Sequence, residues 1–117
     1  MKTILILGAN GRIGFELLKY FLEKKFKVIA VDKNFSKLKS KNLFNLLKIK
    51  LDLSKEKNQN LLINKISYLK KIDGIVYCLY PKTKSWGMNF EKVSEKHIKE
   101  NLYYQLGVPI LFLKNIY

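Results

Sequence analysis

Four short apolar runs divide the chain and predict the strands of a sheet. They lie at Lys2–Leu7, Phe26–Val31, Leu46–Leu51 and Gly74–Leu79. The first run is apolar at consecutive positions, as a strand is when both faces of a parallel sheet are covered. An aspartate follows each of the two middle runs, Asp32 after one and Asp52 after the other. Acidic side chains are therefore expected at the ends of two neighbouring strands.

Between these strands, apolar residues recur at helical spacing. The first predicted helix carries five of them on one face: Ile13, Leu17, Leu18, Phe21 and Leu22. A short helix is expected over Phe35–Leu43, and Ser54 is expected to cap the helix after that. The apolar stripe of the capped helix contains Leu61, Leu62, Ile66 and Leu69.

A polar loop and further helical sequence follow the fourth strand. The loop, Tyr80–Asn89, is of a length that often serves function. Helical spacing resumes at Phe90 or Val93, and Pro109 is expected to kink or divide this helix. Strands alternating with helices predict an α/β fold, a truncated Rossmann-type doubly wound parallel sheet with strand order 3-2-1-4. Residues 1–117 are expected to form one partial domain of this type.

The formal net charge of +14 raises the question of a polyanionic partner. However, 22 of the 23 basic residues are lysines scattered over every predicted element, and Arg12 is the single arginine. Proteins that bind phosphates and bases usually recruit arginine, whose planar guanidinium matches those acceptors. A solvated lysine surface is therefore favoured over a nucleic-acid interface.

Other features of the sequence narrow the compartment. The apolar runs are too short for a transmembrane span or a signal peptide, so no membrane partner is expected. Cys78 is the single cysteine, and no cluster of cysteine and histidine is present to hold a metal. The cytoplasm is the expected location.

A glycine-rich loop joins the first strand to the first helix, with the sequence Gly8-Ala9-Asn10-Gly11-Arg12-Ile13-Gly14. Gly8 allows a tight exit from the strand, Gly11 lets backbone N–H groups approach a pyrophosphate, and Gly14 lets the helix pack closely on the sheet. The amino terminus of the helix adds its dipole and free N–H donors. The loop therefore predicts dinucleotide binding, with Arg12 and Ile13 also at the pyrophosphate and Asn10 within the cofactor site.

Asp32 indicates which dinucleotide is bound. It ends the second strand 18 residues beyond Gly14, where an acidic residue would bind the ribose hydroxyls of the adenosine. A carboxylate accepts hydrogen bonds from the 2′-OH of NAD and repels the 2′-phosphate of NADP. NAD is therefore the expected cofactor and NADP the weaker candidate. Arg12 and Lys33 lie near Asp32 or the glycine loop in sequence, and their positive charge would reduce the preference for NAD over NADP.

These residues resemble the short-chain dehydrogenase/reductase family along the whole chain. The motifs are L-G-A-N-G-R-I-G at 7–14, Asp32, L-D-L-S at 51–54 and D-G-I-V-Y-C-L-Y-P at 73–81. The resemblance implies that Asp52 and Leu53 lie against the adenine and that Cys78 and Leu79 lie beside a cofactor ribose. It implies hydride transfer between nicotinamide and an alcohol or carbonyl of a small molecule. The stretch from 80 to 94 is similar to members of bacterial surface-sugar and flagellin-modification pathways, so a sugar is one candidate substrate.

The same resemblance implies catalytic residues, of which only a supporting part is found. The family carries an Asn-Leu pair on its fifth helix, and this pair matches Asn101 by identity or Gln105 by ungapped counting. Its catalytic Ser and Tyr-x-x-x-Lys elements would follow the next strand, and the sequence stops at Tyr117 before that strand. The alternative to an oxidoreductase is therefore a catalytically inactive, truncated nucleotide-binding module.

Self-association is expected from the same reasoning. In strand order 3-2-1-4 the fourth strand lies at a sheet edge, where its unpaired backbone groups are open to pairing. The last helix carries the run Ile110-Leu111-Phe112-Leu113, which is apolar nearly all round. The predicted partners are thus a dinucleotide, a small-molecule substrate and a second copy of the chain.

Overall fold

The computed structural model describes all residues except 39–42, 70, 80–82 and 117. The chain divides into two compact units, Met1–Leu79 and Tyr80–Tyr117. The first unit contains the sheet, and the second contains helices. None of the helices among the described residues is long and apolar enough to cross a membrane.

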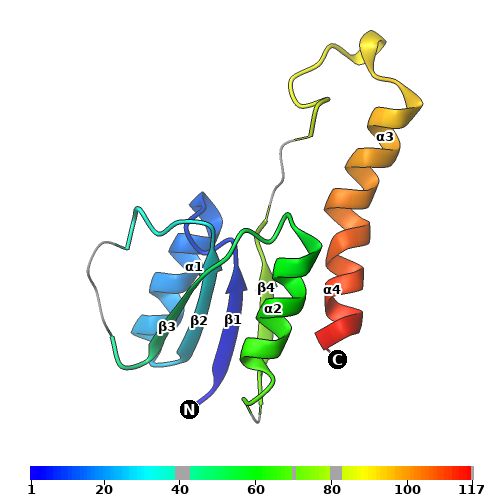
Figure 1. Cartoon of the computed structure of the whole chain (residues 1–117). Coiled ribbons are helices and arrows are strands. Elements are labelled where there is room, and N and C mark those ends of the chain that lie inside the picture. The colour runs from blue at the N-terminus through cyan, green and yellow to red at the C-terminus, as the bar shows by residue number, and fades with distance from the viewer. Residues whose placement is uncertain (39–42, 70, 80–82, 117) are drawn as a thin grey trace. The chain divides into compact units, whose positions relative to one another are not determined.

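The first unit is built on a four-stranded parallel sheet (Figure 1). Its strands are β1 (Thr3–Leu7), β2 (Lys27–Asp32), β3 (Leu46–Lys50) and β4 (Gly74–Tyr77). They lie in the order β3-β2-β1-β4, which confirms the predicted order 3-2-1-4. Each strand also falls within a residue or two of its predicted range.

The register of the sheet brings the ends of all four strands together. Leu7 of β1 pairs with Val31 of β2 and with Tyr77 of β4, and Asp32 pairs with Lys50 at the end of β3. Because the strands are parallel, the residues that follow them all emerge at one edge of the sheet. The glycine loop, the Asp32 carboxylate and the β3 exit therefore lie along the same edge.

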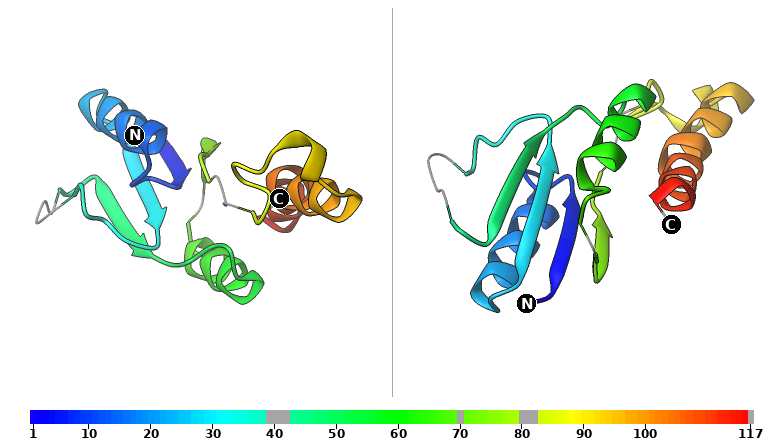
Figure 2. Two further views of the ribbon diagram at one scale, coloured as in Figure 1. Left: turned by 90° about the horizontal axis from the view of Figure 1, so that it is seen from above. Right: turned by 60° about the horizontal axis from the view of Figure 1, so that its bottom comes forward.

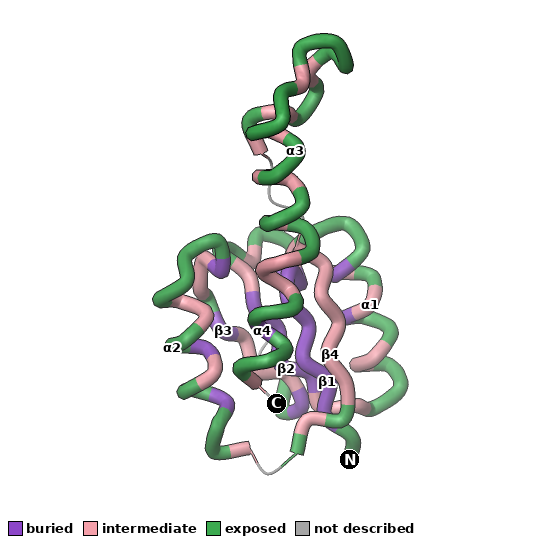
Figure 3. The backbone as a smooth tube through the Cα atoms, turned by 90° about the vertical axis from the view of Figure 1, so that its right-hand side faces the viewer, coloured by how far each residue is buried: buried purple, intermediate pink, exposed green. Residues whose placement is uncertain are grey.

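Helices α1 (Arg12–Glu23) and α2 (Glu56–Ile66) cover opposite faces of this sheet (Figure 2). Buried residues concentrate in the central strands β1 and β2 (Figure 3). Successive strand side chains point to opposite faces, so both faces of β1 are apolar. The cluster under α1 is formed by Ile4, Ile6, Ala9, Leu18, Val28, Ala30 and Leu38.

Three local expectations are corrected by the structure. Ile13, in the first turn of α1, does not join the buried face of the helix but is 69% exposed. The expected helix Phe35–Leu43 is wrong for its described part: residues 33–38 and 43–45 form turns and bends, and 39–42 lie outside the described residues. Ser54 does not cap α2. Its hydroxyl donates to Asp52 instead, and the helix begins after Lys55 without a side-chain cap.

The second unit contains a 3₁₀ turn, η1 (Phe90–Lys92), followed by α3 (Glu95–Leu102), the π-helical η2 (Tyr103–Gly107) and α4 (Val108–Ile116). Ser94 caps α3: its hydroxyl accepts from the His97 N–H, while His97 Nδ1 accepts from the Ser94 N–H. Pro109 lacks an N–H and cannot donate to the carbonyl four residues earlier, which explains why the helix is interrupted just before it. Pro109 itself lies within α4, so the predicted kink or division takes the form of a π-helical turn before it and not of a break.

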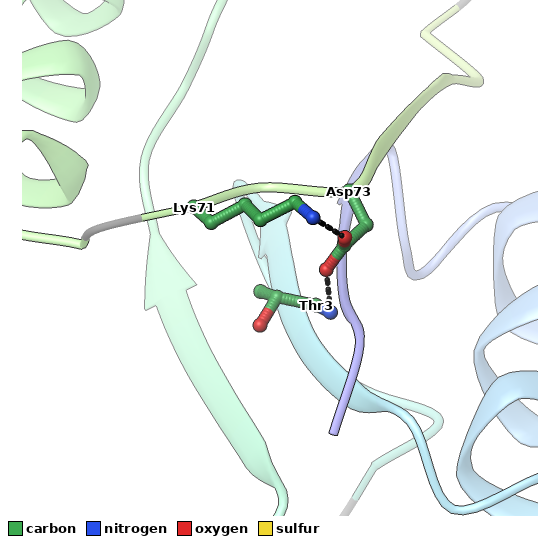
Figure 4. Close-up of polar contacts among 3 residues, drawn as sticks. All are labelled: Thr3, Lys71 and Asp73. Atoms are coloured by element: carbon green, nitrogen blue, oxygen red, sulfur yellow. Dashed lines mark hydrogen bonds and ion pairs between the residues drawn. The ribbon is translucent and has the colours of Figure 1, made fainter.

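A hydrogen-bonded pair joins the amino-terminal ends of β1 and β4 (Figure 4). The Thr3 N–H donates to Asp73 Oδ2 at 2.8 Å, and the Asp73 N–H donates to the Thr3 carbonyl at 2.8 Å. Lys71 Nζ lies 3.2 Å from Asp73 Oδ1. The Thr3 backbone hydrogen bond, and after it Lys71, lower the pKa of Asp73 from its ordinary value of 3.8.

Asp73→Asn should lower the Tm at neutral pH, because the neutral amide accepts the Thr3 hydrogen bond more weakly and loses Lys71. A carboxylate with a lowered native pKa stabilises the fold above its ordinary pKa, and this contribution is lost as the pH falls through the native value. The difference in Tm between wild type and variant should therefore shrink as the pH falls below 3.8. Thermal melts followed by circular dichroism over pH measure it. Lys71→Met, which keeps the Thr3 bond, should have the smaller effect, and a difference that does not change with pH would contradict this role of Asp73.

Candidate dinucleotide-binding site

The glycine loop leaves β1 in a conformation that excludes a side chain at its first residue. Gly8 has a positive φ of 85°, and its N–H donates to the Val31 carbonyl at 2.9 Å. A Cβ at Gly8 would lie 2.8 Å from the carbonyl carbon and oxygen of Cys78. Gly8 therefore fits between the exits of β2 and β4, and no other residue could occupy its place without a shift of the backbone.

Helix α1 begins directly against this turn. A Cβ at Gly14 would lie 2.0 Å from the Gly8 carbonyl oxygen, so the helix can pack this closely only on a glycine. Gly11 differs from the other two glycines. Its φ of −74° and ψ of 176° are open to any residue, and a Cβ there would lie 3.3 Å from the same oxygen. Gly8 and Gly14 are thus required by the fold, whereas a Cβ at Gly11 would need only a small shift of the Gly8 carbonyl.

The amino terminus of α1 suits an anion. Gly11 is its N-cap and no side chain caps it, so the N–H groups of the first turn are left for a ligand. Arg12 and Ile13 in this turn are exposed. A loop with three glycines, a helix dipole and a guanidinium together suit a pyrophosphate, so these residues are chemically compatible with that part of a dinucleotide.

Asp32 lies beside the loop with its carboxylate already oriented. Oδ2 accepts from the Asn10 N–H at 2.9 Å, and Oδ1 accepts from the Lys33 N–H at 2.7 Å. A carboxylate offers about four acceptor positions, so each oxygen keeps capacity for one more donor. Two adjacent hydroxyls of a ribose could supply those donors.

The Asn10 side chain connects the glycine loop to the residues after β2. Its Nδ2 donates to Asn34 Oδ1 at 2.7 Å and to Ser36 Oγ at 3.1 Å, and its Oδ1 accepts from the Lys37 N–H at 3.0 Å. Sequence reasoning placed Asn10 in the site but did not find these partners. They lie 24 to 27 residues away, and no periodic pattern indicates such a contact.

The exit of β3 places Asp52 at the same edge of the sheet. Oδ1 of Asp52 accepts from both the N–H and the hydroxyl of Ser54, at 3.1 and 2.7 Å. The hydroxyl bond first, then the backbone bond, lower the pKa of Asp52, so this group is a carboxylate at neutral pH. Leu53 is buried, and its carbonyl accepts from Gln59 Nε2 at 3.0 Å. Of this pair, Asp52 is the one whose side chain is open to a ligand.

Cys78 and Leu79 follow β4 and contact the glycine loop. The Cys78 N–H donates to the Leu7 carbonyl at 2.8 Å, and its own carbonyl packs against Gly8. Burial raises the pKa of the Cys78 thiol, so the thiolate needed of a nucleophile is disfavoured. Cys78 thus shapes the site through its backbone.

Asn101 and Gln105, the two alternatives for the supporting residue, belong to the second unit. The Asn101 side chain is fully engaged: Oδ1 accepts from Thr83 Oγ1 at 2.6 Å, and Nδ2 donates to Ser85 Oγ and, at 2.9 Å, to the His97 carbonyl. Asn101 therefore fastens the loop after β4 to α3. Gln105 is exposed within η2, and its carbonyl cannot receive the usual helical bond because Pro109 has no N–H.

The sequence and the fold of this chain are similar to those of known proteins. The sequence profile of the NAD dependent epimerase/dehydratase family matches residues 4–103. The post-translational flagellin modification protein A of Campylobacter coli is 35% identical over 119 residues, which cover 94% of this chain and 46% of that protein. The structure of 4-hydroxyisoleucine dehydrogenase complexed with NADH is 28% identical with a TM-score of 0.74, over 99% of this chain and 48% of that one.

A further structure supports the fold alone. The short chain dehydrogenase of Leptospira borgpetersenii with bound NAD⁺ has a TM-score of 0.78 at 22% identity, covering 98% of this chain and 44% of that one. This chain therefore spans about half the length of the relatives that it matches. The profile match and the shared sheet order show that the chain belongs to the NAD dependent epimerase/dehydratase family, with the Rossmann-type fold of short-chain dehydrogenases.

Proposed function

We propose that this chain is the NAD-binding portion of a short-chain oxidoreductase that moves hydride between nicotinamide and an alcohol or carbonyl group. The observation that carries the proposal is the close contact of Gly14 with the Gly8 carbonyl, which sets an uncapped helix beside the Asp32 carboxylate. The bound nicotinamide would supply the hydride acceptor or donor. Residues 1–117 would supply binding and orientation, so binding rather than turnover is the activity proposed for them.

Within this function, each part of the site has one task. The backbone from Gly8 to Gly14, with Arg12 and Ile13 at its outer side, would hold the pyrophosphate. Asp32 would accept the adenosine ribose hydroxyls, which favours NAD over NADP. Asp52, beside Leu53, would accept the adenine amino group, and the backbone at Cys78 and Leu79 would border a ribose.

Two similarities support a substrate class. The Campylobacter coli relative is named for flagellin modification, and 4-hydroxyisoleucine dehydrogenase is named for an alcohol. A small hydroxylated or carbonyl-bearing molecule, with a sugar as one candidate, fits both. Asn101 would assist by holding the loop after β4, and Gln105 would be the alternative support. The cytoplasm is the proposed compartment, and nucleic acid is not a proposed partner.

Gly11→Ala should weaken NAD⁺ binding by about tenfold or more while leaving the fold intact. The Ala backbone fits the observed φ and ψ, but its Cβ would displace the pyrophosphate from N–H groups whose bonds to a charged group are worth about 1.5–3 kcal/mol each. Isothermal titration calorimetry with NAD⁺ and NADH measures the change. Gly74→Ala is the matched control, because its Cβ meets only the tip of the Ile4 side chain at the opposite end of the sheet. Equal affinity in wild type and Gly11→Ala would exclude the loop as the pyrophosphate site.

Asp32→Asn should lower the affinity for NAD⁺ and raise that for NADP⁺. The amide keeps one acceptor oxygen but loses the charge that attracts the diol and repels the 2′-phosphate. Titrations with both cofactors give the ratio of the two dissociation constants. Asp52→Asn, a change of the same kind at the neighbouring strand end, should weaken both cofactors alike and leave the ratio unchanged. If both variants change the ratio of the two dissociation constants equally, Asp32 does not distinguish the ribose of NAD from that of NADP.

Self-association through the β4 edge and α4 is also proposed. β4 is the last strand of the sheet, and α4 exposes apolar side chains, among them Leu111, which is 46% exposed. Light scattering after size exclusion should give about twice the 13.8 kDa of one chain as the concentration rises. Leu111→Asp should return the mass to that of one chain, whereas Leu61→Asp, at an equally exposed leucine of α2, should not. A wild-type mass of one chain at every concentration would exclude the association.

A further inference from the structure

The Asn10 side chain uses all of its amide hydrogen-bonding groups on one segment. Both Nδ2 donors go to Asn34 and Ser36, and Oδ1 accepts from the Lys37 N–H. We call Asn10 and these three partners the Asn10 clasp. The clasp joins the loop that contacts a pyrophosphate to the segment that follows Asp32.

The chemistry of the clasp requires an asparagine. The clasp needs two hydrogen-bond donors and one acceptor from a single short side chain. Among side chains of this length, only the amide of asparagine has two N–H donors together with an acceptor oxygen. Aspartate could accept from Lys37 but could not donate to Asn34 and Ser36. Meanwhile the Asn10 backbone N–H donates to Asp32 Oδ2, so the same residue also orients the carboxylate.

The clasp also determines which donors the segment can offer to a ligand. The N–H of Lys33 donates to Asp32 Oδ1, that of Lys37 to Asn10 Oδ1, and that of Leu38 to the Phe35 carbonyl. The Ser36 N–H lies 3.5 Å from Asn34 Oδ1, an oxygen that Asn10 holds in place. A phosphate is held by free N–H and hydroxyl donors. With the clasp closed, the Lys37 N–H is not available to such a ligand.

The segment is fastened at other points as well. Leu38 is buried in the cluster under α1, and the Lys37 ammonium lies over the Phe15 ring at 5.5 Å. Opening the clasp would therefore free the Lys37 N–H without detaching the segment from the core.

We propose that Asn10 is a specificity-determining residue, whose clasp favours a ribose diol and disfavours a 2′-phosphate by keeping the Lys37 N–H occupied. This inference rests on the proposed function and extends it. Asp32 repels the phosphate by charge, and Asn10 withholds a backbone donor that would partly compensate for that repulsion. The preference for NAD then depends on two residues that lie in different loops.

Asn10→Ala tests the proposal. Titration calorimetry of the variant with NAD⁺ and NADP⁺ should show the preference for NAD⁺ reduced by about tenfold, the effect of roughly one hydrogen bond. Amide hydrogen exchange should show the Lys37 N–H exchanging faster in the variant, with the β1 amides unchanged. Asn58→Ala is the matched control: it removes a 2.8 Å side-chain bond to the Asp52 carbonyl in the neighbouring loop and should leave the preference as in wild type.

Three outcomes would overturn the role of Asn10. If Asn10→Ala lowers the Tm and both affinities but keeps their ratio, the clasp is merely structural. If Asn58→Ala changes the ratio as much, the effect is not specific to the clasp. If wild type binds neither dinucleotide, the proposed function fails and the role of Asn10 fails with it. Wild-type preference for NAD⁺ with an unchanged ratio in Asn10→Ala would leave the proposed function standing and reject the clasp alone.

Discussion

The contact between the Gly8 carbonyl and Gly14 is the constraint on which the rest of the site depends. A helix can start this close to a strand exit only where no Cβ intervenes, and a Cβ at Gly14 would lie 2.0 Å from the carbonyl oxygen. This approach directs the uncapped amino terminus of α1 over the carboxyl edge of the sheet. The parallel register then delivers Asp32 and the β3 exit to the same edge. One steric condition therefore positions groups that come from three different strands.

Hydrogen bonds fix the loops and strand ends that the contact between Gly8 and Gly14 brings together. Asn10 reaches from the glycine loop to Asp32 with its backbone and to residues 34–37 with its side chain. At the opposite end of the sheet, Thr3 and Asp73 fix the pairing of β1 with β4. The apolar core holds the sheet and helices together, and these hydrogen bonds determine the positions of the residues at the ends of the strands. In the second unit, Asn101 has a comparable role, because it fastens the loop after β4 to α3.

Sequence reasoning predicted what depends on local spacing and missed what depends on distant partners. The strands, their order and the roles of Gly8 and Gly14 follow from periodicity and from steric rules for one short loop. The expected helix at Phe35–Leu43 was wrong over its described residues because Asn10, distant in sequence, bonds to Asn34, Ser36 and the Lys37 N–H, and these bonds compete with helical ones. Ser54 matched the preference for a cap, but the Asp52 carboxylate two residues earlier is the stronger partner.

Amide chemical shifts of the ¹⁵N-labelled protein during titration with NAD⁺ test the central claim most directly, because they report where the ligand binds. The account predicts that the largest shifts fall on residues 8–14, with further shifts at Asp32, Lys33 and Asp52, while the amides at the amino-terminal ends of the strands stay in place. The absence of shifts, or small shifts spread over the lysine-rich surface as a polyanion would cause, would contradict it.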